Sequence, residues 1–252
     1  MVHSSAERVV DLIDRPERFR DVQPMGEGNY WQIEGFLREQ VADELHDYLL
    51  DSVEYERFNL ADITAIWRGQ RTLGDPYFGE LLHRPGRASY PRVERCFELY
   101  SSSWMTSLLG QLLGFSVSFL RPPTPTKLEL GDKIAPHDDM QEPLHCAAVV
   151  LNLSKGWKPD FGGATIVGEV DRIVRVPTPL DHAYQVHNWL LTEKQERLPV
   201  RFNSLLVLRL KPGVAHGVAE VTADRARLTM VSNFGRADGM NESQWHGQEW
   251  LD

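Results

Sequence analysis

Four residues in the second half of the sequence could together support metal chemistry. His137 and Asp139 are separated by one residue, His216 follows far downstream, and Arg227 comes shortly after it. Two histidines and one carboxylate can hold a ferrous ion on one face and leave the opposite face open to reactants. Zinc and manganese also suit such donors, so residue types alone do not select the metal. The arginine suggests a fixed positive charge for a small dicarboxylate.

The spacing of the candidate ligands predicts that they lie at strand ends. Residues two apart on an extended segment point to the same side, so His137 and Asp139 can share a cation while Asp138 faces away. Pro136 indicates a strand that leads into a turn, and His216 follows a turn-like Lys-Pro-Gly sequence. An isolated His-x-Asp also occurs by chance in surface loops, so the metal interpretation depends on the rest of the chain.

The last strand-like run presents a polar and an apolar face. Arg225, Arg227 and Thr229 alternate with Leu228 and Met230, so the cationic and hydroxyl-bearing side chains share one face. Such a face beside a metal would suit a carboxylate. An ordinary edge strand with one polar face is the alternative explanation.

The segments expected to position these residues form a helical first part and a β-rich second part. Residues 1–114 are expected to be a mostly helical support region, whose stretch from Phe58 to Tyr90 is mostly loop because of its many glycines and prolines. The expected elements there are a short helix from Ser4 to Pro16, a strand around Trp31–Ile33, and helices over 41–49, 91–100 and 104–113.

After Gly114 the chain changes to short β-rich runs separated by glycine, proline and aspartate. No strand and helix alternate in this half, which disfavours a parallel doubly wound sheet and favours a jelly roll. The sequence therefore predicts a single domain over residues 1–252, mainly β with flanking α-helices, whose core spans 115–236. The expected strands are 116–120, 127–130, 145–153, 164–167, 173–176, 204–208 and 225–234.

Composition excludes several classes of function. The chain has 252 residues and a net charge of −9, which argues against nucleic acid as the main partner. The longest apolar run, Cys146 to Leu151, is too short to cross a bilayer, and no export signal is visible. The two cysteines, Cys96 and Cys146, indicate no disulfide framework. A cytoplasmic protein without a membrane partner is expected.

Five segments in a fixed order resemble the iron(II)- and 2-oxoglutarate-dependent dioxygenases, especially their prolyl 4-hydroxylase-like branch. The order, rather than any one motif, carries the resemblance. The segments are Ile33–Leu37 before a helix, Leu130–Asp132 through His137–Asp139, Leu151–Leu153 with Trp157 and Gly162–Gly163, Asn203–Leu208 through His216–Val218, and Arg227–Thr229.

The resemblance implies a fold, a reaction and roles for particular residues. The fold is a cupin-like double-stranded β-helix, in which Gly162–Gly163 form a turn into a strand. His137, Asp139 and His216 would bind Fe(II), Arg227 would pair with the distal carboxylate of 2-oxoglutarate, and Thr229 would hydrogen-bond beside it. The implied activity consumes O2 and 2-oxoglutarate, releases succinate and CO2, and hydroxylates a substrate. Related halogenases replace the metal-binding carboxylate with a small residue, so the intact Asp139 favours hydroxylation.

Two positions depart from the family pattern. Many relatives have a tyrosine on the strand before the first ligand, where this chain has Thr126 to Glu129, so the second contact to the keto acid stays open. His145 stands where relatives often have arginine. It could contact substrate or co-substrate, or simply pack within the strand.

The substrate is the least determined part of the prediction. The long interval over residues 170–201 is either a substrate lid or a surface excursion, and it contains His182, His187 and Trp189, which with His145 are candidate substrate contacts. A small metabolite or amino-acid-like substrate is expected. The alternatives are a protein side chain as substrate, or a non-catalytic β-helix that only binds a ligand or partner.

Overall fold

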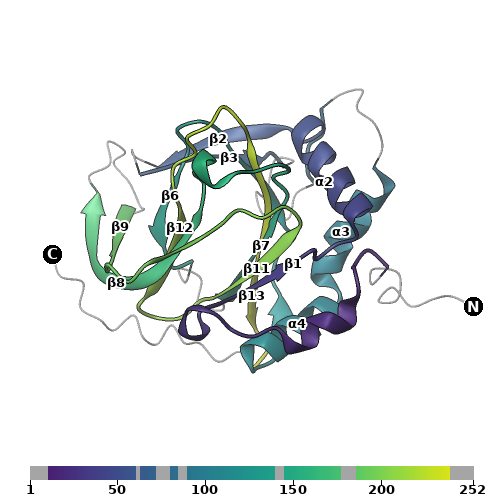
Figure 1. Ribbon diagram of the computed structural model, residues 1–252, viewed down its shortest axis with the longest axis horizontal. Coiled ribbons are helices and arrows are strands. Elements are labelled where there is room, and N and C mark those ends of the chain that lie inside the picture. Colours follow the sequence, from purple (N-terminus) through teal and green to yellow (C-terminus); the bar gives the residue numbers. More distant parts are fainter. Residues whose placement is uncertain are drawn as a thin grey trace, which may run out of the picture.

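The computed structural model describes residues 11–60, 63–71, 80–84, 90–139, 145–176 and 186–238. Two curved antiparallel sheets face each other, and helices cover the outer side of the larger one (Figure 1). The longest helix, α2, has 13 residues. No helix in the described ranges is long and apolar enough to cross a membrane.

Helices are concentrated before residue 114, and strands occur along most of the described chain. The helices are η1 (Pro16–Asp21), η2 (Gly26–Gly28), α2 (Glu39–Asp51), α3 (Pro91–Ser101), α4 (Ser103–Leu113) and η3 (Pro159–Phe161), where η marks a 3-10 helix. The strands are β1 (Tyr30–Glu34), β2 (Tyr55–Leu60), β3 (Thr64–Gly69), β4 (Val117–Phe119), β5 (Thr124–Leu128), β6 (Ile134–His137), β7 (His145–Asn152), β8 (Thr165–Val176), β9 (Val186–Leu191), β10 (Glu196–Leu198), β11 (Ser204–Arg209), β12 (Val214–Val218) and β13 (Arg227–Arg236).

The strand order is that of a double-stranded β-helix. The larger sheet has the order β1-β11-β7-β13-β5-β3-β2, with β4 also paired to β13. The smaller sheet has the order β10-β8-β12-β6, with β9 paired to β8. Because the strands alternate between the sheets from β5 to β8 and again from β10 to β13, residues far apart in sequence face each other across the interior. The predicted mainly β jelly roll with flanking helices is confirmed.

One face of strand β13 contacts the main hydrophobic core, and the other face points into the space between the sheets. Leu228 and Met230 are fully buried in a cluster with Leu45 of α2 and Leu109 of α4, on the outer side of the larger sheet. Alternation along the strand therefore directs Arg227 and its i+2 neighbours to the inner side. The apolar stripe of α2 repeats every three or four residues, as expected for a helix that packs against a sheet.

The first predicted helix is wrong over the residues that are described. Residues 1–10 lie outside the described ranges, and Leu12 and Ile13 are buried in a turn and an isolated bridge between Ile13 and Leu37. Pro16 begins a 3-10 helix instead of ending an α-helix, because its fixed φ suits the first helical turn. A tertiary contact with the segment before α2 has overridden the local helical pattern.

The prediction of a loop between Phe58 and Tyr90 is also partly wrong. Strands β2 and β3 form a hairpin, and β3 pairs with β5. The larger sheet therefore contains strands from before residue 114 as well as after it. Buried Ile66 packs against Leu128 on the inner side. Buried residues of β3 are Thr64, Ile66 and Gly69, and the many glycines and prolines around them indicated a loop instead. Residues 61–62, 72–79 and 85–89 of this stretch lie outside the described ranges.

The interval over residues 170–201 contains the second half of β8 and the strands β9 and β10, so it is not one long loop. The outer half of β8 pairs with β9, with a register shift between Val170 and Arg172. The inner half of β8 pairs with β10 and β12. A bulge of this kind bends a strand, and β9 lies beside β6 (Figure 1). The hairpin therefore reaches the strand that carries His137.

Candidate metal centre

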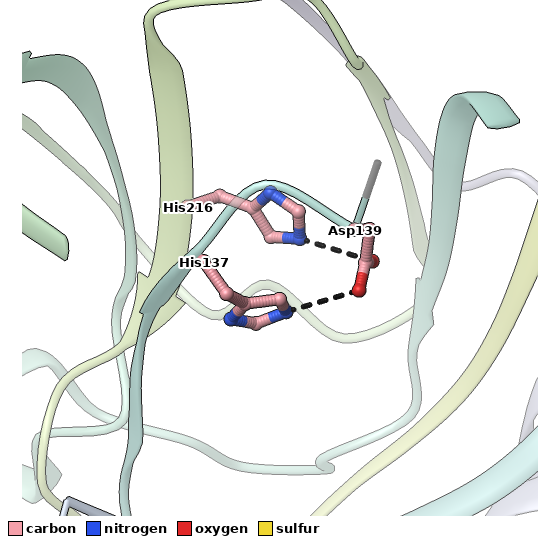
Figure 2. Close-up of side chains that lie close together, drawn as sticks. All are labelled: His137, Asp139 and His216. Carbon is pink, nitrogen blue, oxygen red and sulfur yellow. Dashed lines mark ion pairs between the residues drawn. The ribbon is translucent and has the colours of Figure 1, made fainter. Parts of the chain in front are cut away.

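The smaller sheet brings two histidines and one carboxylate together (Figure 2). His137 ends β6 and is the register partner of His216 on β12. One carboxylate oxygen of Asp139 lies 3.3 Å from His137 Nε2, and the other lies 3.4 Å from His216 Nε2. One potential ligand atom from each side chain lies within 4.8 Å of the other two.

The chain geometry at Asp139 differs from the predicted extended segment. Strand β6 ends at His137, and Asp139 has a φ of +54°, in the left-handed region. Aspartate tolerates this conformation better than most residues do. The turn, and not a shared strand face, directs the carboxylate towards the two histidines. Asp138 is buried and is not part of the cluster.

The three side chains are electrostatically coupled. Burial alone would raise the pKa of Asp139, but the nearby His137 and hydrogen bonds from both histidines outweigh it and hold that pKa well below its usual range. Burial lowers the pKa of His137, yet the charge and hydrogen bond of Asp139 leave it raised overall. Burial and the neighbouring His137 lower the pKa of His216. Metal ligation requires an ionised carboxylate and two neutral imidazoles, so a bound metal would replace the proton that Asp139 favours on His137.

The cluster has the dimensions and orientation of a metal-binding site. Ligand atoms bound to a divalent metal at about 2.1 Å lie no more than about 4.2 Å apart, and both histidine–carboxylate distances are shorter than that. His137 Nδ1 lies 2.8 Å from the carbonyl oxygen of Ala135. Donation from Nδ1 to this carbonyl would orient the ring and leave Nε2 as a ligand. The residues present therefore fit a metal.

Arg227 provides a buried positive charge on the inner side of β13. Its side chain is 2% exposed. One terminal nitrogen donates to Thr165 Oγ1 at 3.2 Å and approaches Asn152 Oδ1 at 3.4 Å, while Nε has no hydrogen-bond partner. Burial lowers the pKa of Arg227 to about 10. Within the described part of the chain no carboxylate pairs with this guanidinium, so a buried cation is left to attract an anionic ligand.

Thr229 is accompanied by a second hydroxyl. Its register partner on β5 is Thr126, and the two buried side-chain oxygens form a short hydrogen bond. Thr126 lies in the segment where many relatives have a tyrosine. The structure thus places the Thr229 hydroxyl two residues along β13 from Arg227, and the Thr126 hydroxyl beside it on β5.

Gly162 and Gly163 form the turn that the resemblance implied. Their φ values are +71° and +68°, and β8 begins two residues later. A Cβ atom on Gly163 would lie 3.0 Å from Cδ of Arg227 and 3.2 Å from the ring of Trp157. The turn therefore needs glycine for its backbone conformation and for the close approach of the arginine.

The predicted substrate residues are dispersed. His145 is buried at the start of β7. His187 and Trp189 lie on β9, beside the strand of His137, and Trp189 is buried. His182 lies outside the described residues, and Arg225 is exposed before β13 instead of sharing its inner face. The role of each in substrate binding stays a prediction.

Three polar residues near the site were missed by sequence reasoning. Asn152 and Thr165 contact Arg227, and Asn233 lies 3.2 Å from His145 through its side-chain nitrogen. Continuing the alternation of Arg227 and Thr229 along β13 would have placed Asn233 on the inner face. No local pattern indicates Thr165, because its contact with Arg227 depends on how the two sheets face each other.

The Gly217→Ala substitution is expected to disturb the metal centre by steric overlap. A Cβ atom at this position would lie 2.6 Å from the carbonyl oxygen of Ile134 and 2.9 Å from the nitrogen of Pro136, both in the backbone of β6. The pairing of His137 with His216 would have to shift. We expect a loss of about 1–3 kcal/mol in the free energy of unfolding, together with weaker Co(II) binding.

Denaturant unfolding and Co(II) titration measure both effects. Gly168→Ala on β8 is the matched control, because its Cβ would lie 3.1 Å from Cβ of Gln195 and 3.4 Å from Cδ1 of Leu191, so mainly side chains would have to adjust. If both variants lost the same unfolding free energy and Co(II) affinity, the close contact between β12 and β6 would not be what maintains the metal centre.

Comparison with known proteins supports the fold assignment. No protein-family model matches the chain, and no curated protein matches its sequence. Among solved structures, a Trichoplax adhaerens prolyl hydroxylase in complex with a hypoxia-inducible-factor peptide fragment has a TM-score of 0.58 and 12% identity, covering 95% of this chain and 94% of that one. An oxidoreductase of the 2OG-Fe(II) oxygenase family from Burkholderia pseudomallei has a TM-score of 0.58 and 16% identity, covering 91% and 94%.

A third similar structure binds a small molecule. The epimerase SnoN, in complex with Fe3+, alpha-ketoglutarate and nogalamycin RO, has a TM-score of 0.53 and 14% identity, covering 92% of this chain and 84% of that one. These identities are low, so the likeness establishes the fold. The fold is the one on which 2-oxoglutarate-dependent oxygenases are built.

Proposed function

We propose that this chain, with the fold of the 2-oxoglutarate-dependent oxygenases, is itself an iron(II)- and 2-oxoglutarate-dependent oxygenase that hydroxylates a small metabolite or an amino-acid-like compound. One observation carries the proposal. A His-Asp-His cluster and a buried arginine without a carboxylate partner in the described residues occupy the space between the same two sheets. A metal site alone would leave the buried guanidinium unexplained.

The register of the strands places Arg227 near the strand that carries His216. Arg227 donates to Thr165, and Thr165 is the register partner of Val218 on β12. His216 lies two residues from Val218 on the same strand, which corresponds to roughly 7 Å at 3.3–3.4 Å per residue. A short dicarboxylate such as 2-oxoglutarate has a suitable length to pair with Arg227 at one end and to reach the metal centre at the other.

The proposed role of each residue follows from its position. His137, Asp139 and His216 would hold the metal, which when bound would supply oxygen activation coupled to decarboxylation of the keto acid. Arg227, with its buried charge, would bind the distal carboxylate of the keto acid. The Thr229 hydroxyl would hydrogen-bond to the same carboxylate. The sheets on either side would keep water from the reacting groups.

A small substrate is favoured by the polar residues that share the interior with the metal site. Thr165 and Asn233 are buried, at 5% and 2% exposure. Buried polar groups discriminate strongly in favour of ligands that complete their hydrogen bonds. The alternative is a protein side chain, and the Trichoplax neighbour was solved with a peptide fragment. A non-catalytic β-helix that only binds a ligand is the second alternative.

Succinate production tests the proposed reaction. Protein reconstituted with Fe(II), 2-oxoglutarate and O2 should release succinate, and fractions of a cell extract that contain the substrate should raise the rate above the uncoupled background. Separation of the active fractions by size distinguishes a small metabolite from a protein. If no complex of protein, Fe(II) and 2-oxoglutarate can be detected under anaerobic conditions, the chain is not an oxygenase of this kind.

Thr126 is expected to replace the missing tyrosine by orienting Thr229. The Thr126→Val substitution keeps the shape but removes the hydroxyl that pairs with Thr229. We expect the dissociation constant of 2-oxoglutarate for the metal-loaded protein to rise about fivefold, since one hydrogen bond contributes roughly 1 kcal/mol. Titration calorimetry measures it. Thr222→Val, which removes an exposed hydroxyl bound to the Asp160 carbonyl, should leave the affinity unchanged.

A further inference from the structure

A buried histidine contacts the backbone of the residue that supplies the carboxylate. His145 Nδ1 lies 3.0 Å from the carbonyl oxygen of Asp139. The two residues belong to different parts of the fold, because His145 begins β7 of the larger sheet while Asp139 follows β6 of the smaller sheet. The contact thus ties the metal-binding turn to the opposite wall of the interior.

The chemistry of the two groups fixes the direction of this hydrogen bond. A carbonyl oxygen only accepts, so His145 Nδ1 must carry the proton. Asn233 Nδ2 lies 3.2 Å from the same nitrogen. A protonated Nδ1 cannot accept from it, but an amide turned with its oxygen towards the ring would share the same proton. Asn233 on β13 therefore confines the imidazole beside Asp139.

The Asp139 turn has two features that make such a contact consequential. Its φ of +54° is a conformation that most residues with a side chain avoid, so the surrounding structure must maintain it. The same residue also places both of its carboxylate oxygens near histidine nitrogens. Rotation of the Asp139 peptide would change the direction of the carboxylate.

We infer that His145 is a positioning residue of the metal centre, whose Nδ1–H holds the Asp139 peptide so that the carboxylate faces His137 and His216. This inference rests on the proposed metal site and assigns His145 a role other than direct contact with substrate. Partners that orient a metal ligand typically change metal affinity 10–100-fold when they are removed. A residue that contacts only substrate would leave metal affinity unchanged.

Co(II) titration of the full chain, followed by visible absorption without any substrate, tests the inference. His145→Ala should bind Co(II) about 10–100-fold more weakly than the wild type. His145→Asn should stay within about threefold, because its amide nitrogen can donate from nearly the same position as Nδ1. His46→Ala is the matched control, since His46 Nδ1 lies 2.7 Å from the Leu153 carbonyl far from the metal ligands. That variant should bind Co(II) as the wild type does.

The outcomes separate this inference from the proposed function. Wild-type protein that shows no saturable Co(II) binding dependent on Asp139 would contradict the metal centre itself. Normal binding by His145→Ala, or equal losses in the alanine and asparagine variants, would overturn only the positioning role. If His145→Ala does not fold, His145→Gln takes its place, because its amide reaches the position of Nε2 instead of Nδ1. It should then lose affinity while His145→Asn keeps it.

Discussion

Asp139→Asn is expected to abolish oxidation and to weaken Co(II) binding more than about 100-fold, beyond the range typical of residues that only orient a ligand. The substitution keeps the size of the side chain but removes the negative charge. His137 and the hydrogen bonds from both histidines keep this carboxylate ionised, and its charge raises the pKa of His137, so the substitution removes the anionic member of the ligand set. Absorption titration with Co(II) and the succinate assay measure the two effects.

Asp138→Asn is the matched control for this prediction. The two carboxylates are adjacent in sequence, and Asp138 is buried but does not belong to the metal-binding group. We expect it to reduce Co(II) affinity less than about tenfold. A larger loss in Asp138→Asn than in Asp139→Asn would show that the carboxylate ligand has been assigned to the wrong residue.

Arg227→Met is expected to separate ligand binding from stability. Removing one partner of a buried charge pair costs about 2–5 kcal/mol, so the affinity of the metal-loaded protein for 2-oxoglutarate should fall about 30-fold to several thousand-fold. The free energy of unfolding without ligand should be unchanged or higher. The guanidinium is buried, its Nε has no partner, and no carboxylate among the described residues compensates its charge.

Thermal denaturation in the presence and absence of 2-oxoglutarate reports both quantities, because a ligand that binds only the folded state raises the melting temperature. The wild type should be stabilised by the keto acid and Arg227→Met should not. Arg225→Met is the control, since Arg225 is exposed and stacks near Phe161. A large keto-acid-dependent shift retained by Arg227→Met would show that another group binds the distal carboxylate.

The sequence by itself determined the fold class and proposed the four residues on which the site depends. Short β-rich runs without intervening helices indicated a jelly roll, and the order of the motifs linked His137, Asp139 and His216 to Arg227. The fold class could be predicted because alternation along a strand is a local property, whereas the roles of the four residues stay predictions. The structure then placed the three candidate ligands within reach of one another.

Only the tertiary structure decided how these residues are held. The contact between Arg227 and Thr165 joins residues 62 positions apart in the sequence. The left-handed turn at Asp139 and its hydrogen bond from His145 depend on how β6 and β7 are placed in the two sheets. The hairpin of β2 and β3 was missed for a related reason, since its place is fixed by pairing with β5. Strand register and sheet-to-sheet contact follow from burying apolar surface across the whole chain, which is a collective property that local sequence cannot specify.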